Sequence, residues 1–338
     1  MPTWYAAPPW WLAMIFVVVG FYVLIKGADI LVIGGVQVAK RFDLSPAVIG
    51  ATIVAFGTSL PELVVSLGSN IKALQLGQTG ADGPAAIALG NVIGSNIFNI
   101  GAILGITALL RPLAVPRSTF RLDYPLMLLA FALLIVFSVS GEGAMIDRGE
   151  GLVLVCGLIA FTVLAVRTGQ VDVQEVIEHD RPVSNVWAGL GLVVVGAALL
   201  CVAGDVSLSG ALALSRAIGM SERVIGLTVM ALGTSLPELA TSIQAVRRGH
   251  GEMALGNVVG SNIFNVFCIV GIAAMVIPIP VNASNLGWDY WWMGGFALLL
   301  LPLLVTQRSL DRWEGALLLL ALLSYIGLLL GWPDLGSG

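Results

Sequence analysis

The sequence predicts an all-α polytopic membrane protein, with ten transmembrane helices forming two inverted five-helix repeats and with broken helices at the centre. Three observations predict this fold: the composition, a series of long apolar stretches and an internal repeat. Of the 338 residues, 58% are hydrophobic and 11% are charged, and the mean hydropathy is +0.97. Because about a quarter of the residues of a soluble domain are charged, this composition indicates a protein of the lipid bilayer.

Ten stretches are long and apolar enough to cross a bilayer, which takes about 20 residues in a helix. The predicted spans lie near 12–38, 46–71, 84–110, 122–140, 150–167, 187–215, 222–246, 252–278, 289–306 and 312–331. Met1 to Trp11 lacks the basic region of a cleavable signal peptide. The first span is therefore expected to serve as its own insertion signal.

The basic residues of the loops predict how the chain is oriented. Alternate loops hold eleven and four of them: Lys40, Arg41, Arg111, Arg117, Arg121, Arg167, Arg181, Arg247, Arg248, Arg308 and Arg312 against Lys72, Arg148, Arg216 and Arg223. Because cytoplasmic loops are enriched in Lys and Arg, both termini are expected outside the cytoplasm. The short loops suggest a prokaryotic plasma (inner) membrane, and nothing suggests binding to nucleic acid.

An internal repeat covers both halves of the chain. The segment GTSLPE occurs at Gly57 to Glu62 and again at Gly233 to Glu238, and ALGNVIGSNIFN at Ala88 to Asn99 returns almost unchanged at Ala254 to Asn265. With five spans in each half, the second copy must enter the membrane from the opposite side. We therefore expect repeats over 12–167 and 187–331, joined by a cytoplasmic linker at 168–186, an arrangement typical of secondary transporters.

The proline of the repeated motif predicts a broken helix. Pro61 has no N–H to bond the carbonyl of Gly57, and its ring crowds that carbonyl. Pro237 occupies the same place in the second copy. Carbonyl oxygens that such a break releases are tolerated at membrane depth only when they face protein, water or an ion.

Polar side chains recur at helical spacing around each break. Glu62 shares a helix face with Thr58, Ser59 and Ser66, because these residues lie three or four positions apart. The same spacing recurs in a second polar stripe of the first half and in the two equivalent stripes of the second half. The residues are Asn91, Ser95 and Asn99; Thr234, Ser235, Glu238 and Ser242; and Asn257, Ser261 and Asn265. Almost every group in this set binds through oxygen.

A ring of oxygens with two carboxylates favours a hard cation. Ca²⁺ takes six to eight oxygen ligands in flexible geometry, whereas Mg²⁺ demands stricter octahedral order. Na⁺ is similar in radius to Ca²⁺ and could use the same oxygens. Because a carboxylate in mid-membrane is costly and indicates function, Glu62 and Glu238 are the predicted centre of the site.

Several of these features also have purely structural explanations. A single proline often only kinks a membrane helix, and the hydroxyls of Ser66 and Ser242 could bond their own backbone. The GxxxG pairs at 90–94 and 256–260 indicate close helix packing. Asn96 and Asn262 could cap or bond the broken helices. Asp29, one turn after Lys26, and its equivalent Asp205 are expected in a structural ion pair or a helix-end contact.

On the two repeated motifs the chain resembles the calcium/cation antiporter superfamily, in particular the prokaryotic sodium/calcium exchangers. The resemblance implies four central ion sites lined by the second, third, seventh and eighth helices, with the first and sixth helices sliding across them. It implies these ligands: the carboxylates of Glu62 and Glu238; the hydroxyls of Thr58, Ser59, Thr234, Ser235, Ser95 and Ser261; the carbonyls of Ala55 and Ala231; and the neighbouring amides of Asn99 and Asn265.

The chain differs from some members of that superfamily at Asn99 or Asn265. Those members carry Asp at one of these two positions, whereas this chain has Asn at both. The change removes a possible third carboxylate, which speaks against the potassium co-transport associated with that Asp.

The leading functional hypothesis is a secondary antiporter that exchanges Ca²⁺ for Na⁺, with a Ca²⁺/H⁺ antiporter as the alternative. A passive channel fits the paired helix breaks less well, and an enzyme is not expected because no span holds HExxH or a nucleophile beside a base. No cofactor is predicted beyond the transported ions. The expected partners are Ca²⁺, Na⁺ or H⁺ and the lipid bilayer, with a monomer as the expected state.

Overall fold

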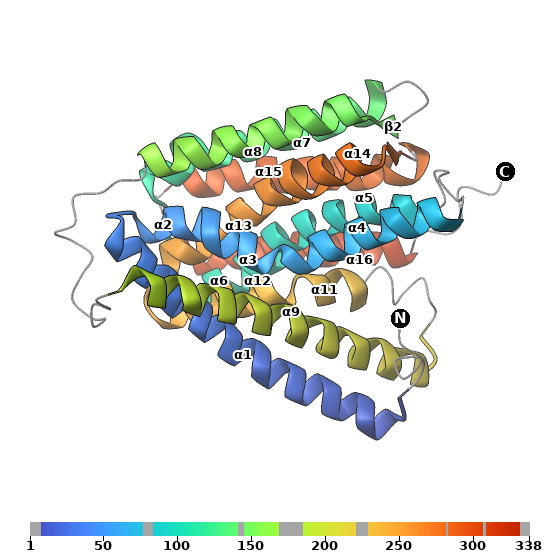
Figure 1. The fold of residues 1–338 in the computed structure, drawn as a ribbon, viewed down its shortest axis with the longest axis horizontal. Helices are drawn as coiled ribbons and strands as arrows, with labels where there is room; N and C mark the ends of the chain where they lie inside the picture. The colour runs from blue at the N-terminus through green and yellow to red at the C-terminus, as the bar shows by residue number, and fades with distance from the viewer. Residues whose placement is uncertain are drawn as a thin grey trace.

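The protein is a bundle of long helices, most of which run nearly parallel (Figure 1). The computed structural model describes residues 8–76, 84–140, 145–168, 185–220, 229–281, 283–306 and 309–331. Most of the predicted linker at 168–186 thus lies outside the described residues.

The helices of the first half follow the predicted spans. They are α1 (Trp10–Arg41), α2 (Pro46–Ile49), a π-helix (Gly50–Val54), α3 (Ala55–Thr58), α4 (Leu60–Leu76), α5 (Pro84–Phe98), a π-helix (Asn99–Leu104), α6 (Gly105–Leu110), a π-helix (Thr119–Asp123), α7 (Tyr124–Ser140) and α8 (Arg148–Thr168). Several predicted spans are therefore built from two to four consecutive helical pieces.

The second half repeats this order. Its described helices are α9 (Val186–Ala217), α11 (Ala231–Thr234), α12 (Leu236–Arg247), α13 (Gly251–Phe264), a π-helix (Asn265–Val270), α14 (Gly271–Val276), α15 (Ala283–Thr306) and α16 (Arg312–Gly331). Within the described residues, seven helical segments are long and apolar enough to cross a membrane, and the bent pair Pro46–Thr58 and Leu60–Lys72 makes an eighth. The chain is thus a multi-pass membrane protein, and the count of ten spans stays a prediction.

The helix breaks lie where the prolines predict them. Ser59, with φ −86° and ψ 4°, separates α3 from α4, and the two parts of this span are bent by 43°. Ser235, with φ −90° and ψ 7°, separates α11 from α12 in the same way. Each proline then stands in the first turn of the new helix, where its missing N–H leaves no hydrogen bond of that helix unmade.

The π-helices were not predicted from the sequence. Two of them begin at Asn99 and Asn265, equivalent residues of the two repeats. A π-helix changes the backbone bonding from i→i+4 to i→i+5 and commonly occurs at functional sites. Both predicted amide neighbours of the site thus lie where the backbone departs from α-helical geometry.

Helix α13 lies in the closely packed centre of the fold. Residues Met253 to Phe264 of this helix are buried. A Cβ atom on Gly256 would lie 2.3 Å from the carbonyl oxygen of Ala47, and one on Gly260 would lie 2.4 Å from that of Ala51. The predicted packing role of these two glycines is confirmed, because only glycine permits so close an approach.

Helices α1 and α9 lie side by side along one face of the bundle (Figure 1). Glycines bring their backbones together: a Cβ atom on Gly34 would lie 2.8 Å from the carbonyl oxygen of Gly189, and one on Gly196 would lie 2.7 Å from the amide nitrogen of Leu31. These small residues make a smooth contact between the two longest helices.

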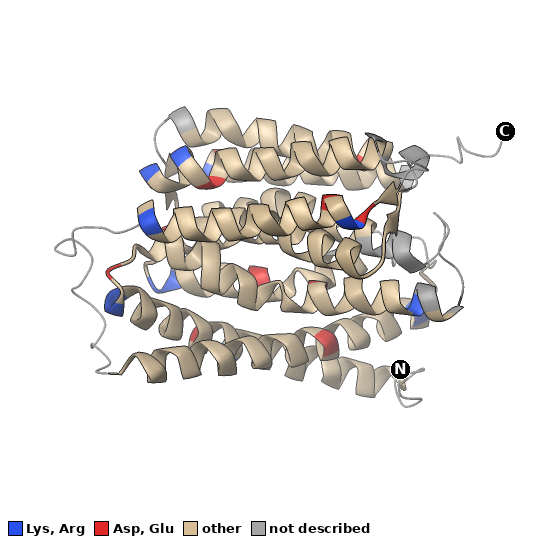
Figure 2. Ribbon diagram, turned by 45° about the horizontal axis from the view of Figure 1, so that its top comes forward, with Lys and Arg blue, Asp and Glu red and all other residues tan. Residues whose placement is uncertain are grey.

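Two short antiparallel strand pairs join the halves at the helix ends. Strand β1 (Leu113–Ala114) pairs with β4 (Ser309–Leu310), and β2 (Met145–Ile146) pairs with β3 (Ile279–Pro280). Each pair joins two loops that the charge count assigns to the same side of the membrane. Lys and Arg positions gather mainly at one end of the bundle, on the left in Figure 2.

Candidate cation-binding site

Two glutamates occupy equivalent places beside the helix breaks. Glu62 lies in the first turn of α4 and Glu238 in the first turn of α12. Both side chains are 1% exposed. A helix N-terminus stabilises a negative charge, so each break supplies a favourable place for its carboxylate. Two ionised carboxylates in one site repel each other, and a cation between them would relieve that repulsion.

Glu238 is held by residues of both repeats. The Ser59 hydroxyl of the first repeat donates to Glu238 Oε1 at 3.0 Å. Asn257 donates from Nδ2 to the Glu238 carbonyl oxygen at 3.4 Å and to Ser242 Oγ at 3.0 Å. The Thr58 hydroxyl lies 3.3 Å from Asn257 Oδ1. The four side chains Thr58, Ser59, Glu238 and Asn257 therefore form one connected site.

Ala55 opens α3, the short helix that precedes the first break, and its carbonyl oxygen faces the end of that helix through two hydrogen bonds. It accepts from the Thr58 hydroxyl at 3.2 Å and from the Ser59 N–H at 3.0 Å. Ala231 opens α11, the equivalent helix, and its side chain lies outside the described residues. The structure thus places both alanines one turn before a break, and their role as carbonyl ligands stays a prediction.

Ser95 brings the third predicted span to the site. Its hydroxyl oxygen lies 3.5 Å from Thr234 Oγ1 of the other repeat. Its equivalent, Ser261, is 0% exposed on α13. The Ser95 hydroxyl thus reaches the second break, and Ser261 is buried at the equivalent place of the other repeat.

The two amides at the start of the π-helices bond across the halves. Asn99 Nδ2 donates to Asn262 Oδ1 at 3.0 Å, and Asn265 Nδ2 donates to Asn96 Oδ1 at the same distance. Of the roles left open for Asn96 and Asn262, the structure shows bonding to the amide of the other repeat. The asparagine at the start of each π-helix thus donates to an asparagine of the opposite repeat, and the two bonds are equivalent.

Six oxygens of the predicted ligands are buried without a hydrogen-bond partner in the described part of the chain. They are Glu62 Oε2, Glu238 Oε2, Ser235 Oγ, Ser261 Oγ, Asn99 Oδ1 and Asn265 Oδ1. A buried polar atom left unpaired costs about 1–3 kcal/mol. Because carboxylate and amide oxygens only accept, a bound cation is the natural partner for this set.

The donor set suits a hard cation. Within the described residues no cluster of three or more His, Cys, Asp and Glu side chains is found, so the two glutamates act with hydroxyls and amides. This chemistry matches Ca²⁺ and Na⁺ better than a transition metal, which prefers imidazole or thiolate.

The two half-sites are not equal. Ser59 donates to Glu238, whereas Ser235, its equivalent beside the other break, is unpartnered in the described part of the chain. Ser66 Oγ is likewise buried without a described partner, while Ser242 accepts from Asn257. The two serines beside the breaks therefore differ in their hydrogen bonding among the described residues.

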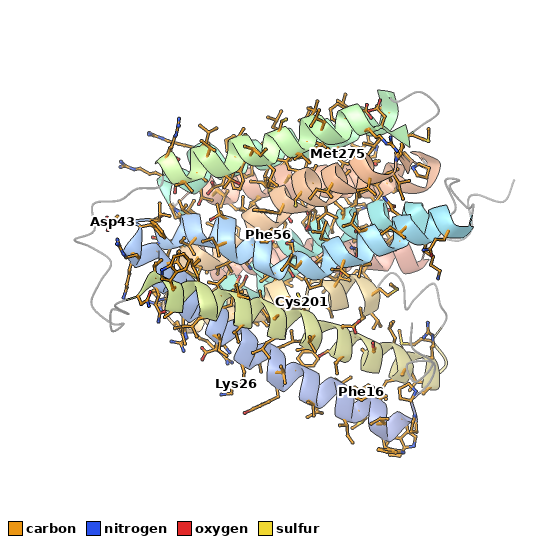
Figure 3. All side chains as sticks on the ribbon, viewed as in Figure 1. Phe16, Lys26, Asp43, Phe56, Cys201 and Met275 are labelled. Atoms are coloured by element: carbon orange, nitrogen blue, oxygen red, sulfur yellow. The ribbon has the colours of Figure 1, made fainter. Side chains whose placement is uncertain are left out.

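Asp29 lies away from these ligands and forms the expected ion pair, but with another partner. Arg248 Nε lies 2.6 Å from Asp29 Oδ1, which ties α1 to the end of α12. Lys26 instead extends from the outer side of α1 (Figure 3), with its Nζ 5.8 Å from the centre of the Tyr22 ring. The ion-pair partner of Asp29 is thus a residue distant in sequence and not the nearby Lys26.

Comparison with models of known families matches residues 12–167 and 188–331 to the family described as sodium/calcium exchanger protein. The chain belongs to this family. The family consists of transporters, and the match covers both copies of the repeated motif.

Comparison with individual proteins also supports membership of the exchanger family. The chain is 37% identical to the putative antiporter CaxA of Alkalimonas amylolytica, over 93% of this chain and 97% of that one. It is 32% identical to the inner membrane protein YrbG of Escherichia coli, over 91% and 93%. A structure of the sodium-calcium exchanger NCX_Mj, soaked with Na⁺ and Ca²⁺, matches with a TM-score of 0.75 and 30% identity, over 95% and 99%.

Proposed function

We propose that the protein is a secondary antiporter that exchanges Ca²⁺ for Na⁺ across the membrane by alternating access. Both ions would compete for one central site around Glu62 and Glu238. The observation that carries this proposal is the set of six buried, unpartnered oxygens, which includes both carboxylates and comes from both repeats.

Charge balance gives the reason for competition. Two carboxylates neutralise one Ca²⁺, and after its release their charge can be balanced by Na⁺. A ligand shifts a conformational equilibrium only through its different affinity for the two states. Exchange therefore requires that the empty, doubly negative site disfavour the change of access, because its buried charges are then uncompensated.

The arrangement of the repeats supports alternating access. We propose ten spans in two inverted repeats, 12–167 and 187–331, with the linker 168–186 in the cytoplasm. The strand pairs β1–β4 and β2–β3 each join one loop from either half, which supports a symmetric pairing of the two repeats. The NCX_Mj match and the inner-membrane relative support exchange in a prokaryotic plasma membrane.

The residues around the two breaks supply the oxygens that we propose as ligands. The proposed ligands are Glu62, Glu238, Thr58, Ser59, Thr234, Ser235, Ser95 and Ser261, with the amides of Asn99 and Asn265 beside them and the carbonyls of Ala55 and Ala231. Hydroxyl oxygens are useful to a Na⁺ ion, whereas a proton needs no such cage. The set therefore favours Na⁺ over H⁺ as the counter-ion.

Uptake of ⁴⁵Ca²⁺ into proteoliposomes tests the function. Vesicles loaded with Na⁺ and diluted into Na⁺-free buffer should accumulate Ca²⁺, whereas vesicles with a pH gradient and no Na⁺ should not. Accumulation driven by the pH gradient alone would instead establish Ca²⁺/H⁺ exchange. Equilibration without accumulation under either gradient would identify a passive pathway.

A further inference from the structure

Two short chains of hydrogen bonds lead outward from the site to methionines. In one, Asn265 Nδ2 donates to Asn96 Oδ1 at 3.0 Å, and Asn96 Nδ2 lies 3.8 Å from Met293 Sδ. In the other, Asn99 Nδ2 donates to Asn262 Oδ1 at 3.0 Å, and Asn262 Nδ2 lies 3.6 Å from Met127 Sδ. The chains are equivalent in the two repeats.

The methionine fixes the direction of each chain. A thioether sulfur has no hydrogen to donate and can only accept, so Asn262 must present its NH₂ group to Met127. Its Oδ1 then faces Asn99, which must present its own NH₂ group in return. Both ends of each amide are thereby determined, although an isolated amide could point either way.

The fixed direction of each hydrogen-bond chain has a consequence at the end opposite the methionine, at Asn99 and Asn265. With their NH₂ groups engaged, Asn99 and Asn265 each keep an Oδ1 that is buried and has no partner within the described residues. An amide oxygen is a good ligand for a hard cation, whereas an NH₂ group in its place would repel one. The direction set at the sulfur therefore decides which end each amide offers to an ion.

We propose that Met127 and Met293 are positioning residues for cation binding, acting through Asn262 and Asn96 to present the Oδ1 atoms of Asn99 and Asn265. This inference rests on the proposed function. Both methionines are 0% exposed, and they lie on α7 and α15, outside the segments that supply the ligands. Ion selectivity thus depends on two helices that do not touch the ions.

The effect of losing a sulfur depends on the charge of the ion. Without the acceptor, Asn262 can reverse, and Asn99 then loses its fixed direction. Because an electrostatic energy is proportional to the charge of the ion, the binding free energy lost for Ca²⁺ should be about twice that lost for Na⁺. The fold-change in apparent affinity for Na⁺ should therefore be about the square root of the fold-change for Ca²⁺.

Met127→Leu and Met293→Leu test this inference, because Leu nearly conserves the volume and lacks the acceptor. Loss of an outer partner of an ion ligand typically lowers affinity about 10-fold or more. We expect KM for Ca²⁺ to rise about 10-fold in Na⁺-driven uptake and the half-saturating Na⁺ concentration to rise about 3-fold. Vmax should change less than twofold, whereas a structural fault would lower Vmax instead.

Met253→Leu is the matched control. Met253 is a buried methionine of α13 whose methyl carbon lies 3.7 Å from where a Cβ of Gly35 would stand. Its replacement by Leu removes a sulfur from the interior without touching the amide chains. It should leave both ion constants near those of the unchanged protein.

A binding measurement in detergent accompanies the transport assay. Ca²⁺ should raise the Tm of each folded variant, with about 10-fold more Ca²⁺ needed for Met127→Leu or Met293→Leu than for Met253→Leu. The positioning role is overturned if Met127→Leu and Met293→Leu match Met253→Leu in both assays. Absence of uptake by the unchanged protein would overturn the proposed function instead, and the Tm series would still decide the role of the methionines.

Discussion

Single side chains at the breaks form the candidate site, and equivalent side chains differ in their hydrogen bonds. Glu62 and Glu238 are equivalent in sequence and in burial, yet Ser59 donates to Glu238 while Ser235 has no partner among the described residues. An exchanger that opens to one side at a time requires such a difference between half-sites. In the opposite state we expect Ser235 to donate to Glu62.

Ser59→Ala should destabilise the ion-free protein more than Ser235→Ala. A hydrogen bond to a charged group contributes about 1.5–3 kcal/mol, and only Ser59 makes one among the described contacts of these two serines. Tm in detergent without Na⁺ or Ca²⁺ measures the difference. Equal losses for the two variants would show that the observed inequality does not persist in solution.

At the scale of whole helices, the two prolines determine where the helices break. The breaks at Ser59 and Ser235 place helix N-termini beside the carboxylates. An unbroken helix would move those N-termini away and would close the backbone oxygens into hydrogen bonds. The break is therefore proposed as part of the site and not only as a bend.

Pro61→Ala should raise stability and lower transport. Alanine restores an N–H that can bond the Gly57 carbonyl, and it removes the clash of the proline ring. We expect a higher Tm together with at least a several-fold lower rate of Na⁺-driven Ca²⁺ uptake. Pro302→Ala is the control, since Pro302 lies inside α15 away from the ligands. A rate unchanged by Pro61→Ala would contradict a functional break.

The element scale also shows what the sequence can and cannot predict. The bend before Pro61 and the hydroxyl stripes follow from local rules about proline and helical spacing. The π-helices that begin at Asn99 and Asn265 have no such local signature, because tertiary packing decides them. The partner of Asp29, Arg248, lies 219 positions away, so local spacing suggested only the nearer Lys26.

The amide chains could have been partly foreseen. Asn96 and Asn262 recur in register in the repeat, which indicates a shared role. Their acceptors Met127 and Met293 lie on other helices, and methionine in an apolar span carries no signal of a polar contact. Only the three-dimensional structure could supply that link.

At the scale of the whole molecule, orientation in the membrane remains the main prediction. The strand pair β1–β4 is expected at the cytoplasmic ends of the helices and β2–β3 at the opposite ends. The basic positions gathered at one end of the bundle (Figure 2) agree with this assignment.

Cysteine labelling should establish the orientation. In a variant with Cys156, Cys201 and Cys268 replaced, Met145→Cys should react with an impermeant maleimide added to intact spheroplasts. Ser309→Cys should react only after the membrane is opened. Met145 is 39% exposed and Ser309 is partly exposed, so both are accessible to the reagent. The reverse pattern would place both termini in the cytoplasm.

The central claim is that Glu62 and Glu238 together bind the exchanged ions, and Na⁺-driven ⁴⁵Ca²⁺ uptake tests it most directly. Glu62→Gln and Glu238→Gln each remove one of the two charges that balance Ca²⁺, so each should abolish uptake. Glu252→Gln, at the first turn of α13, should retain it. Full uptake by either Glu62→Gln or Glu238→Gln would contradict the account.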